Sequence, residues 1–196
     1  MMLTFATSNA HKVAEIRSLL PKGITIQCLS DIGFKDEIIE TSPTIEGNSL
    51  QKAKFLSEKL GIACFAEDTG LEIEVLNGRP GVYSARYAGE RASYADNVQK
   101  VLKELEGKKN RRAQFKTVIT YYDGVVSVSF TGLCEGEILT KGRGEGGFGY
   151  DPIFVPTGCN HSFAEMRLIE KNEYSHRRKA LDLFLEWLKN SNPSPV

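Results

Sequence analysis

The 196-residue sequence has few cysteines and no excess of charge of either sign, and each shortage excludes a class of protein. The four cysteines are scattered and form no C-x-x-C pair, which argues against a disulfide framework and against a structural metal site. Lysine and arginine together number 25, as do aspartate and glutamate. This balance lacks the broad basic surface of proteins that bind nucleic acid or membranes, so we expect neither partner.

Long hydrophobic runs are also missing. No segment approaches the roughly 20 apolar residues of a membrane-spanning helix, and residues 1–6 lack the basic start and apolar length of a signal peptide. No repeat or linker rich in proline, glycine or serine divides the chain. We therefore expect a cytoplasmic protein with a single bilobed domain over residues 1–190 and a frayed tail at residues 191–196.

The hydrophobic pattern changes repeatedly between strand and helix, which predicts an α/β fold. The predicted strands cover residues 3–6, 24–29, 62–66, 113–122, 125–134 and 153–155. Helices are predicted after Asn9, after an N-cap at Ser42, after Ser93 and from Ser175. Gly61 closes the second of these helices, and Asp123-Gly124 predicts a two-residue β-hairpin turn.

Two adjacent acids, Glu67 and Asp68, end the strand predicted over residues 62–66. In extended backbone their side chains point to opposite faces, so only one can enter a given site. The carboxyl end of a buried strand is where α/β sheets usually bind ligands. With Glu40 nearby, one face could hold Mg²⁺ through carboxylates and ligand phosphates. The alternative is that these acids are exposed and only end the strand.

Lys12 lies in the first turn of the first predicted helix, where the helix dipole disfavours a cation. A bound anion would reverse this effect, and Thr7, Ser8 and Asn9 add polar groups at the same helix start. Together they resemble a phosphate site. The alternative is a solvated lysine behind an ordinary helix cap.

The last predicted helix repeats this anomaly. His176, Arg177, Arg178 and Lys179 crowd its positive end, and Lys171 lies just upstream. These groups predict an anion site, unless they are solvated or paired with Glu170 and Glu173.

A glycine-rich loop contains Gly144, Gly146 and Gly149 in a G-x-G-x-x-G pattern. A dinucleotide site is rejected, because the following Tyr150-Asp151-Pro152 provides no helix start for a pyrophosphate. Phe148 and Tyr150 instead suggest rings that stack on a base. Packing of either ring in the core is the alternative.

Taken together, several motifs resemble the inosine/xanthosine triphosphate pyrophosphatase family. They are T-S-N-A-H-K at residues 7–12, E-D-T-G-L at 67–71, P-G-V-Y-S-A-R-Y-A-G at 80–89, G-G-F-G-Y-D-P-I-F at 146–154 and S-H-R at 175–177. The resemblance spans nearly the whole chain. Any one motif is weak, but their order makes chance agreement very improbable.

The resemblance implies an elongated mixed sheet with flanking helices, two lobes around a central nucleotide cleft, and a homodimer. It implies hydrolysis of inosine, deoxyinosine and xanthosine triphosphates to the monophosphate and pyrophosphate, with Mg²⁺ as cofactor. Asp68 would be the base or a metal ligand, and Glu40 a second metal ligand. The implied substrate-binding residues are Thr7, Ser8, Asn9, Ala10, His11, Lys12, Thr69, Phe148, Gly149, Tyr150, Asp151, Lys171, His176 and Arg177.

The chain departs from the family pattern at Glu67, where many relatives have Asp, and at Thr69, where many have Ser. Donors such as Lys171 and Arg177 should favour a 6-oxo purine over adenine, whose amino group would leave them unpaired. Three other functions were weighed. A Maf-like nucleotide pyrophosphatase should lack the F-G-Y-D-P and S-H-R elements. A catalytically silent nucleotide-binding module would gain little from acidic residues without a metal. An RNA-binding protein is disfavoured by the neutral net charge.

Overall fold

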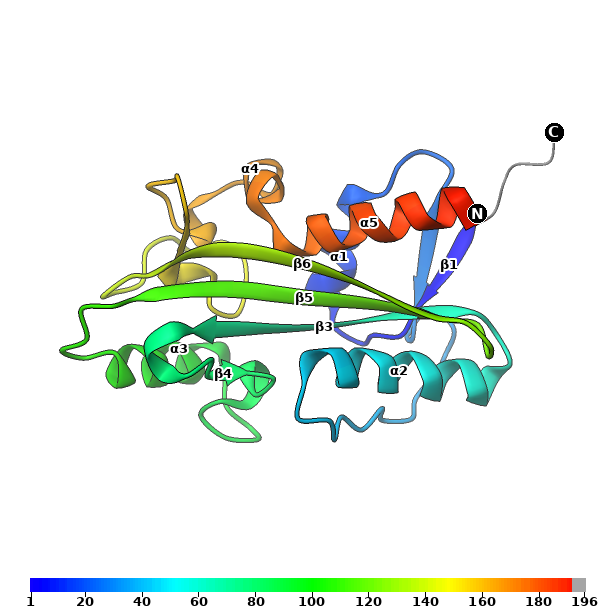
Figure 1. Cartoon of the computed structure of the whole chain (residues 1–196), viewed down its shortest axis with the longest axis horizontal. Coiled ribbons are helices and arrows are strands. Elements are labelled where there is room, and N and C mark those ends of the chain that lie inside the picture. The colour runs from blue at the N-terminus through cyan, green and yellow to red at the C-terminus, as the bar shows by residue number, and fades with distance from the viewer. Residues whose placement is uncertain (192–196) are drawn as a thin grey trace. The chain divides into compact units, whose positions relative to one another are not determined.

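The alternating strand and helix patterns produce the predicted α/β fold, with a mixed sheet and flanking helices, in a computed structural model that describes residues 1–191 (Figure 1). The strands are β1 Met2–Phe5, β2 Thr25–Cys28, β3 Cys64–Ile73, β4 Pro80–Gly81, β5 Arg112–Tyr122, β6 Ser127–Ile138 and β7 Phe154–Pro156. The α-helices are α1 Ala10–Leu19, α2 Ile45–Leu60, α3 Tyr94–Glu104, α4 Leu168–Tyr174 and α5 His176–Ser191. The strand order is β2-β1-β3-β5-β6-β7, and β4 pairs with β3.

The described chain divides into two compact units that interleave along the sequence. Unit 1 comprises Met1–Asp68, Thr117–Gly132 and the chain from Arg177 onward, and unit 2 comprises Thr69–Lys116 and Leu133–His176. Strands β3, β5 and β6 contribute residues to both units. No helix within residues 1–191 is long and apolar enough to cross a membrane.

Unit 1 has a hydrophobic cluster on each face of its strands. Helices α1 and α5 cover one face, where Phe5 stacks on Phe65 with ring centroids 4.5 Å apart. Helix α2 covers the other face, where Cys64 and Ala66 of β3 are buried (Figure 1). Because side chains alternate along a strand, Phe65 and Glu67 belong to the α1/α5 face and Ala66 and Asp68 to the α2 face.

Unit 2 has one core, in which aromatic rings from β5, β7 and the turn before α4 meet. Phe115 lies 4.7 Å from Phe154 and 6.0 Å from Phe163 between ring centroids. Val98 and Val101 of α3 are buried there. The helical spacing of Tyr94, Val98 and Val101 predicts that all three share one buried face, and for Tyr94 that prediction is wrong. It is the first residue of α3 and 43% exposed, and its ring contacts Phe148 instead.

Three helix ends lie at the predicted capping residues, and a fourth does not. Asn9 caps α1, Ser93 caps α3, and Gly61 ends α2 in the left-handed conformation with φ 66°. The predicted N-cap at Ser42 is wrong, because Thr44 caps α2 by accepting a hydrogen bond from the Gly47 N–H. The Ser42 hydroxyl accepts from the Thr44 N–H and so supports the cap from two residues upstream.

Strand β3 does not stop at Glu67 and Asp68, as the sequence predicted, but continues to Ile73. It keeps a partner there, because β4 pairs with it at Leu71 and Glu72. The parallel partner β1 ends at Phe5, opposite Phe65. The two acids therefore lie within β3 yet beyond the carboxyl end of β1, where ligands bind in parallel sheets.

Two smaller boundaries also differ from the prediction. The hairpin between β5 and β6 closes with a hydrogen bond from the Asp123 N–H to the Val126 carbonyl, so its two central residues are Gly124 and Val125. Helix α5 includes Ser191, which was assigned to a frayed tail. Residues 192–196 of that predicted tail lie outside the described residues.

Candidate active site

The turn from β1 into α1 gathers the residues predicted to bind phosphate. The Asn9 carboxamide oxygen accepts hydrogen bonds from the N–H groups of His11 and Lys12, at 3.0 and 3.1 Å. The Thr7 hydroxyl in turn accepts from the Asn9 N–H at 3.2 Å. Two of the N–H donors at the start of α1 thus already have an acceptor within the protein, while Ser8, Ala10 and His11 are exposed.

Lys12 has an anionic partner in the protein itself. Its ammonium lies 3.3 Å from a carboxylate oxygen of Glu67, in unit 1. The pKa of Lys12 lies below its ordinary value, because the lowering effect of burial outweighs the raising effect of the Glu67 carboxylate. The anion that the sequence predicted near Lys12 is therefore supplied at least in part by Glu67.

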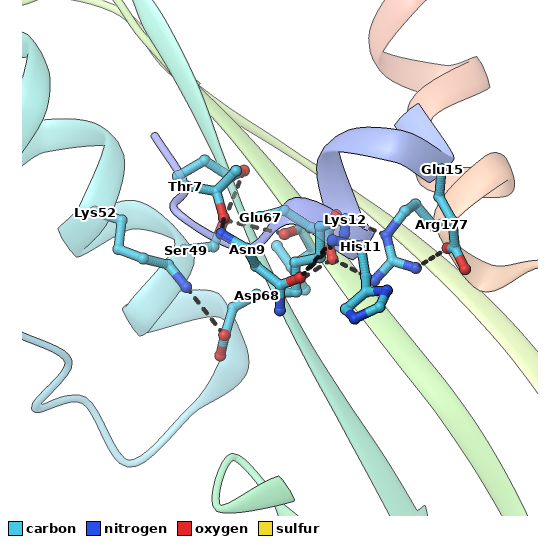
Figure 2. A network of polar contacts seen from close by, with 12 residues as sticks. Thr7, Asn9, His11, Lys12, Glu15, Ser49, Lys52, Glu67, Asp68 and Arg177 are labelled. Atoms are coloured by element: carbon cyan, nitrogen blue, oxygen red, sulfur yellow. Dashed lines mark hydrogen bonds and ion pairs between the residues drawn. The ribbon is translucent and has the colours of Figure 1, made fainter. Parts of the chain in front are cut away.

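Arg177 is a buried partner of two carboxylates. Only 1% exposed, it donates to both oxygens of Glu67 at 2.8 Å and also to Glu15 of α1 (Figure 2). The pKa of Arg177 is raised, because these carboxylates outweigh the effect of burial. Glu15 was missed by the sequence analysis, since an acid five residues into a helix carries no distinguishing signal. The contact of Arg177 with a purine stays a prediction.

Lys52 of α2 is the second site residue that the sequence analysis missed. Its ammonium lies 2.5 Å from Glu40 and 3.1 Å from Asp68, so it joins the two predicted metal ligands, and Figure 2 shows it reaching Asp68 from α2. Burial would lower the pKa of Lys52, but Asp68 and Glu40 together raise it. A signal existed, because position 52 lies on the buried face of the helix with Ser49 and Leu56, where lysine is rare.

Asp68 combines burial with an unused oxygen. Burial raises the pKa of its carboxyl, opposed by Lys52 and Lys12. One oxygen accepts from Lys52, whereas the other is buried and has no hydrogen-bond partner among the described residues. Such a buried acceptor costs free energy unless a ligand satisfies it. No group of three or more His, Cys, Asp or Glu side chains that could hold a metal occurs among residues 1–191.

Three cations and four carboxylates form this cluster in unit 1, which leaves one formal negative charge. They are Lys12, Lys52 and Arg177, with Glu15, Glu40, Glu67 and Asp68. A polyphosphate would meet net repulsion here unless it arrived with a divalent cation. Asp68, which has an unfilled oxygen, and the nearby Glu40 fit such a cation when phosphates complete its coordination.

Unit 2 brings together a second set of predicted residues. The Lys171 ammonium lies 2.6 Å from a carboxylate oxygen of Asp151, and the same oxygen accepts from the Phe148 N–H at 2.9 Å. Lys171 also lies over the Phe148 ring, 5.1 Å from its centroid. Asp151 therefore fixes both the loop that carries the ring and the cation beside it.

The remaining predicted residues of unit 2 are more deeply packed. The His176 ring stacks on Phe115 with centroids 4.7 Å apart. Tyr150 is buried in the unit 2 core and donates to the Ser84 carbonyl at 2.8 Å, which is the core alternative left open above. Thr69 is half-buried in β3, and Gly149 adopts φ 62°. The substrate contacts of these residues stay predictions.

Comparison with known proteins gives one consistent result. Residues 3–187 match the model of the Ham1 family. A protein of Flavobacterium psychrophilum named dITP/XTP pyrophosphatase is 51% identical over 190 residues, which cover 97% of this chain and 100% of that protein. A protein of Porphyromonas gingivalis with the same name is 46% identical, over 95% of this chain and 96% of that protein.

Solved structures agree. The Ham1 protein of Staphylococcus aureus is 34% identical with a TM-score of 0.88, covering 98% of this chain and 100% of that one. A HAM1 protein from Coxiella burnetii is 36% identical with the same TM-score, over 97% and 99% of the two chains.

Proposed function

The chain belongs to the Ham1 family, and we propose from this membership that it hydrolyses noncanonical purine nucleoside triphosphates. It is a nucleoside triphosphate pyrophosphatase, which cleaves the bond between the α- and β-phosphates and releases the monophosphate and pyrophosphate. Relatives named dITP/XTP pyrophosphatase match nearly the whole chain. The structural observation that carries the proposal is the cluster of the buried Asp68 and Lys52 with the half-buried Glu40, beside the start of α1.

The residues of unit 1 suit the triphosphate part of the substrate. The start of α1 with Lys12 provides positive charge and backbone N–H groups. Glu40 and Asp68 would hold a divalent cation, which we propose to be Mg²⁺. When bound, Mg²⁺ would neutralise the negative charge that develops on the leaving pyrophosphate. The buried, unpartnered oxygen of Asp68 and the net charge of the cluster support this assignment.

The carboxyl of Asp68 is also suited to act as a base. We propose that it accepts a proton from the attacking water, whose oxygen forms the new bond to phosphorus while pyrophosphate departs. Its raised pKa brings its basicity closer to what proton transfer at neutral pH requires. The Lys52 ammonium, 3.1 Å away, orients the carboxylate and balances its charge.

The residues of unit 2 suit the purine. The half-buried Phe148 ring offers a face for stacking, and the Lys171 ammonium beside it is a donor for the 6-oxo group of hypoxanthine or xanthine. Adenine has an amino group at that position, so Lys171 would lose an acceptor. Sites that lose a buried partner in this way can discriminate by up to about 10⁴ in rate.

One substrate panel tests the proposal. Purified protein with Mg²⁺ should release pyrophosphate from inosine, deoxyinosine and xanthosine triphosphates far faster than from ATP or GTP. Equal rates on all five would remove the base preference, and release of orthophosphate would contradict the bond assignment. Asp68→Asn should abolish turnover without changing the circular dichroism spectrum.

The proposal also includes a homodimer in the cytoplasm. The dimer follows from the resemblance of the chain to pyrophosphatases of this kind. Light scattering on the purified protein should give twice the 21.7 kDa chain mass, and a monomer mass would contradict the dimer.

A further inference from the structure

The segment that carries Glu40 runs back along α2 and is bound by it residue by residue. Lys52 contacts the Glu40 carboxylate at 2.5 Å, Gln51 accepts from the Thr41 N–H at 3.0 Å, and Asn48 accepts from the Ser42 N–H at 2.9 Å. The Gln51 amide also donates to the Thr41 hydroxyl at 3.0 Å. Residues 40, 41 and 42 of the segment thus meet residues 52, 51 and 48 of α2, so the segment and the helix run in opposite directions.

This side-chain ladder ties the segment to α2, and Ile38 just upstream packs against the hydrophobic cluster under the same helix. Residues 37–42 belong to no helix or strand, so no backbone pairing with a sheet or helix fixes them. The segment lies so close to α2 that a Cβ atom at Gly47 would lie 1.9 Å from the Ser42 hydroxyl oxygen. Only glycine fits there without moving the segment.

Asn48 is the innermost member of the ladder. It is completely buried, and its amide nitrogen has no hydrogen-bond partner among the described residues. A buried donor without an acceptor lowers stability, so packing alone is a poor reason for asparagine at this position. Its oxygen, however, binds the backbone two residues beyond Glu40 and is well placed to fix where that carboxylate lies.

We propose that Asn48 and Gln51 are positioning residues for Glu40, and that they set the affinity of the protein for a divalent cation. The inference rests on the proposed function for the assignment of Glu40 and Asp68 to the cation. Asp68 lies in β3 and needs no such support, whereas Glu40 lies in a segment outside the described helices and strands, which the ladder holds against α2. Groups that hold a metal ligand in place typically contribute about 10- to 100-fold to metal affinity.

Binding of Mn²⁺ to the full-length protein without nucleotide, measured by electron paramagnetic resonance, tests the proposal directly. Asn48→Ala should weaken Mn²⁺ binding at least about tenfold, and Gln51→Ala should weaken it less, because its side chain is half-buried. Gln51→Ala also serves if Asn48→Ala does not fold. Glu58→Ala, an exposed position of α2 outside the ladder, is the control and should bind like the wild type.

A double-mutant cycle separates positioning from simple destabilisation. If Asn48 acts through Glu40, the Asn48→Ala change should have no further effect on Mn²⁺ affinity in a Glu40→Gln background. The accompanying fall in melting temperature should be similar in both backgrounds. Unchanged Mn²⁺ affinity in both ladder variants, or an equal loss in the Glu40→Gln background, would overturn the proposal.

The same experiment distinguishes this inference from the proposed function. A wild-type protein that binds Mn²⁺ and responds to the ladder variants but releases no pyrophosphate would refute the function and leave the ladder standing. A wild-type protein that releases pyrophosphate but shows no response to the ladder variants would do the reverse. Absence of Mn²⁺ binding by the wild type would overturn the positioning role.

Discussion

Replacing Arg177 with methionine should destabilise unit 1 more than the same replacement at the neighbouring Arg178. The substitution keeps much of the side-chain volume but removes the cation between Glu67 and Glu15, both of which are buried. Breaking a buried ion pair by removing one partner costs about 3–5 kcal/mol. Because Lys12 still pairs with Glu67, we expect a loss near the lower end.

That loss converts into a measurable change in melting temperature. For a protein of this size, 1 kcal/mol corresponds to about 2–4 °C, so Arg177→Met should lower the melting temperature by about 6–12 °C. Arg178→Met is the matched control. Arg178 lies next to Arg177 in α5 but forms an exposed pair with Asp182, and such a pair contributes about 0.3–0.5 kcal/mol.

Differential scanning calorimetry at neutral pH, with urea unfolding as a second measure, checks the prediction. The control should lose no more than about 2 °C. If the two variants melted within a degree of each other, the buried carboxylates would not depend on Arg177, and the reasoning from burial and charge would be refuted.

Three further changes have expected outcomes. Lys12→Met should raise the Michaelis constant for inosine triphosphate by roughly tenfold in steady-state kinetics, because a cation at the start of α1 is lost; an unchanged constant would exclude Lys12 from phosphate binding. Gly147→Ala should lower stability by about 1–3 kcal/mol in urea unfolding, because its Cβ would lie 2.1 Å from an Asp151 oxygen at a φ of 71°. Hydrogen bonds from Ser93 hold the pKa of Asp96 below its ordinary value, so the stability that the cap of α3 adds is present at neutral pH and lost as the pH falls through that lowered pKa. The stability difference between wild type and Asp96→Asn should therefore shrink as the pH falls below the ordinary pKa of an aspartate.

Much of the fold was predictable because it depends on local signals. The caps at Asn9, Ser93 and Gly61 were correct, since each needs only the geometry of one helix end. The extent of β3 was not predictable, because Glu67 and Asp68 disfavour a strand locally. Pairing with β4 and ion pairs to distant lysine and arginine residues offset that cost.

The residues of the candidate site were likewise predictable only in part. Glu40, Asp68 and Lys12 were identified from residue type and position along the chain. Lys52 and Glu15 were missed, because their importance lies in partners 12 or more residues away. The anions expected near Lys12 and Arg177 proved to include carboxylates of the protein itself. The helix-dipole argument could not predict this, because it considers one helix at a time and not the carboxylates that other segments bring to it.

The amino-acid sequence alone determined the α/β class, several helix ends and the family resemblance, because these depend on periodicity, capping and motif order. Only the tertiary structure decided which charges meet. It paired Arg177 with Glu67 across 110 residues, joined Glu40 and Asp68 through Lys52, and folded the Glu40 segment onto α2. The physical reason is that buried ionic groups are stable only beside specific partners, and the packing of distant segments selects those partners.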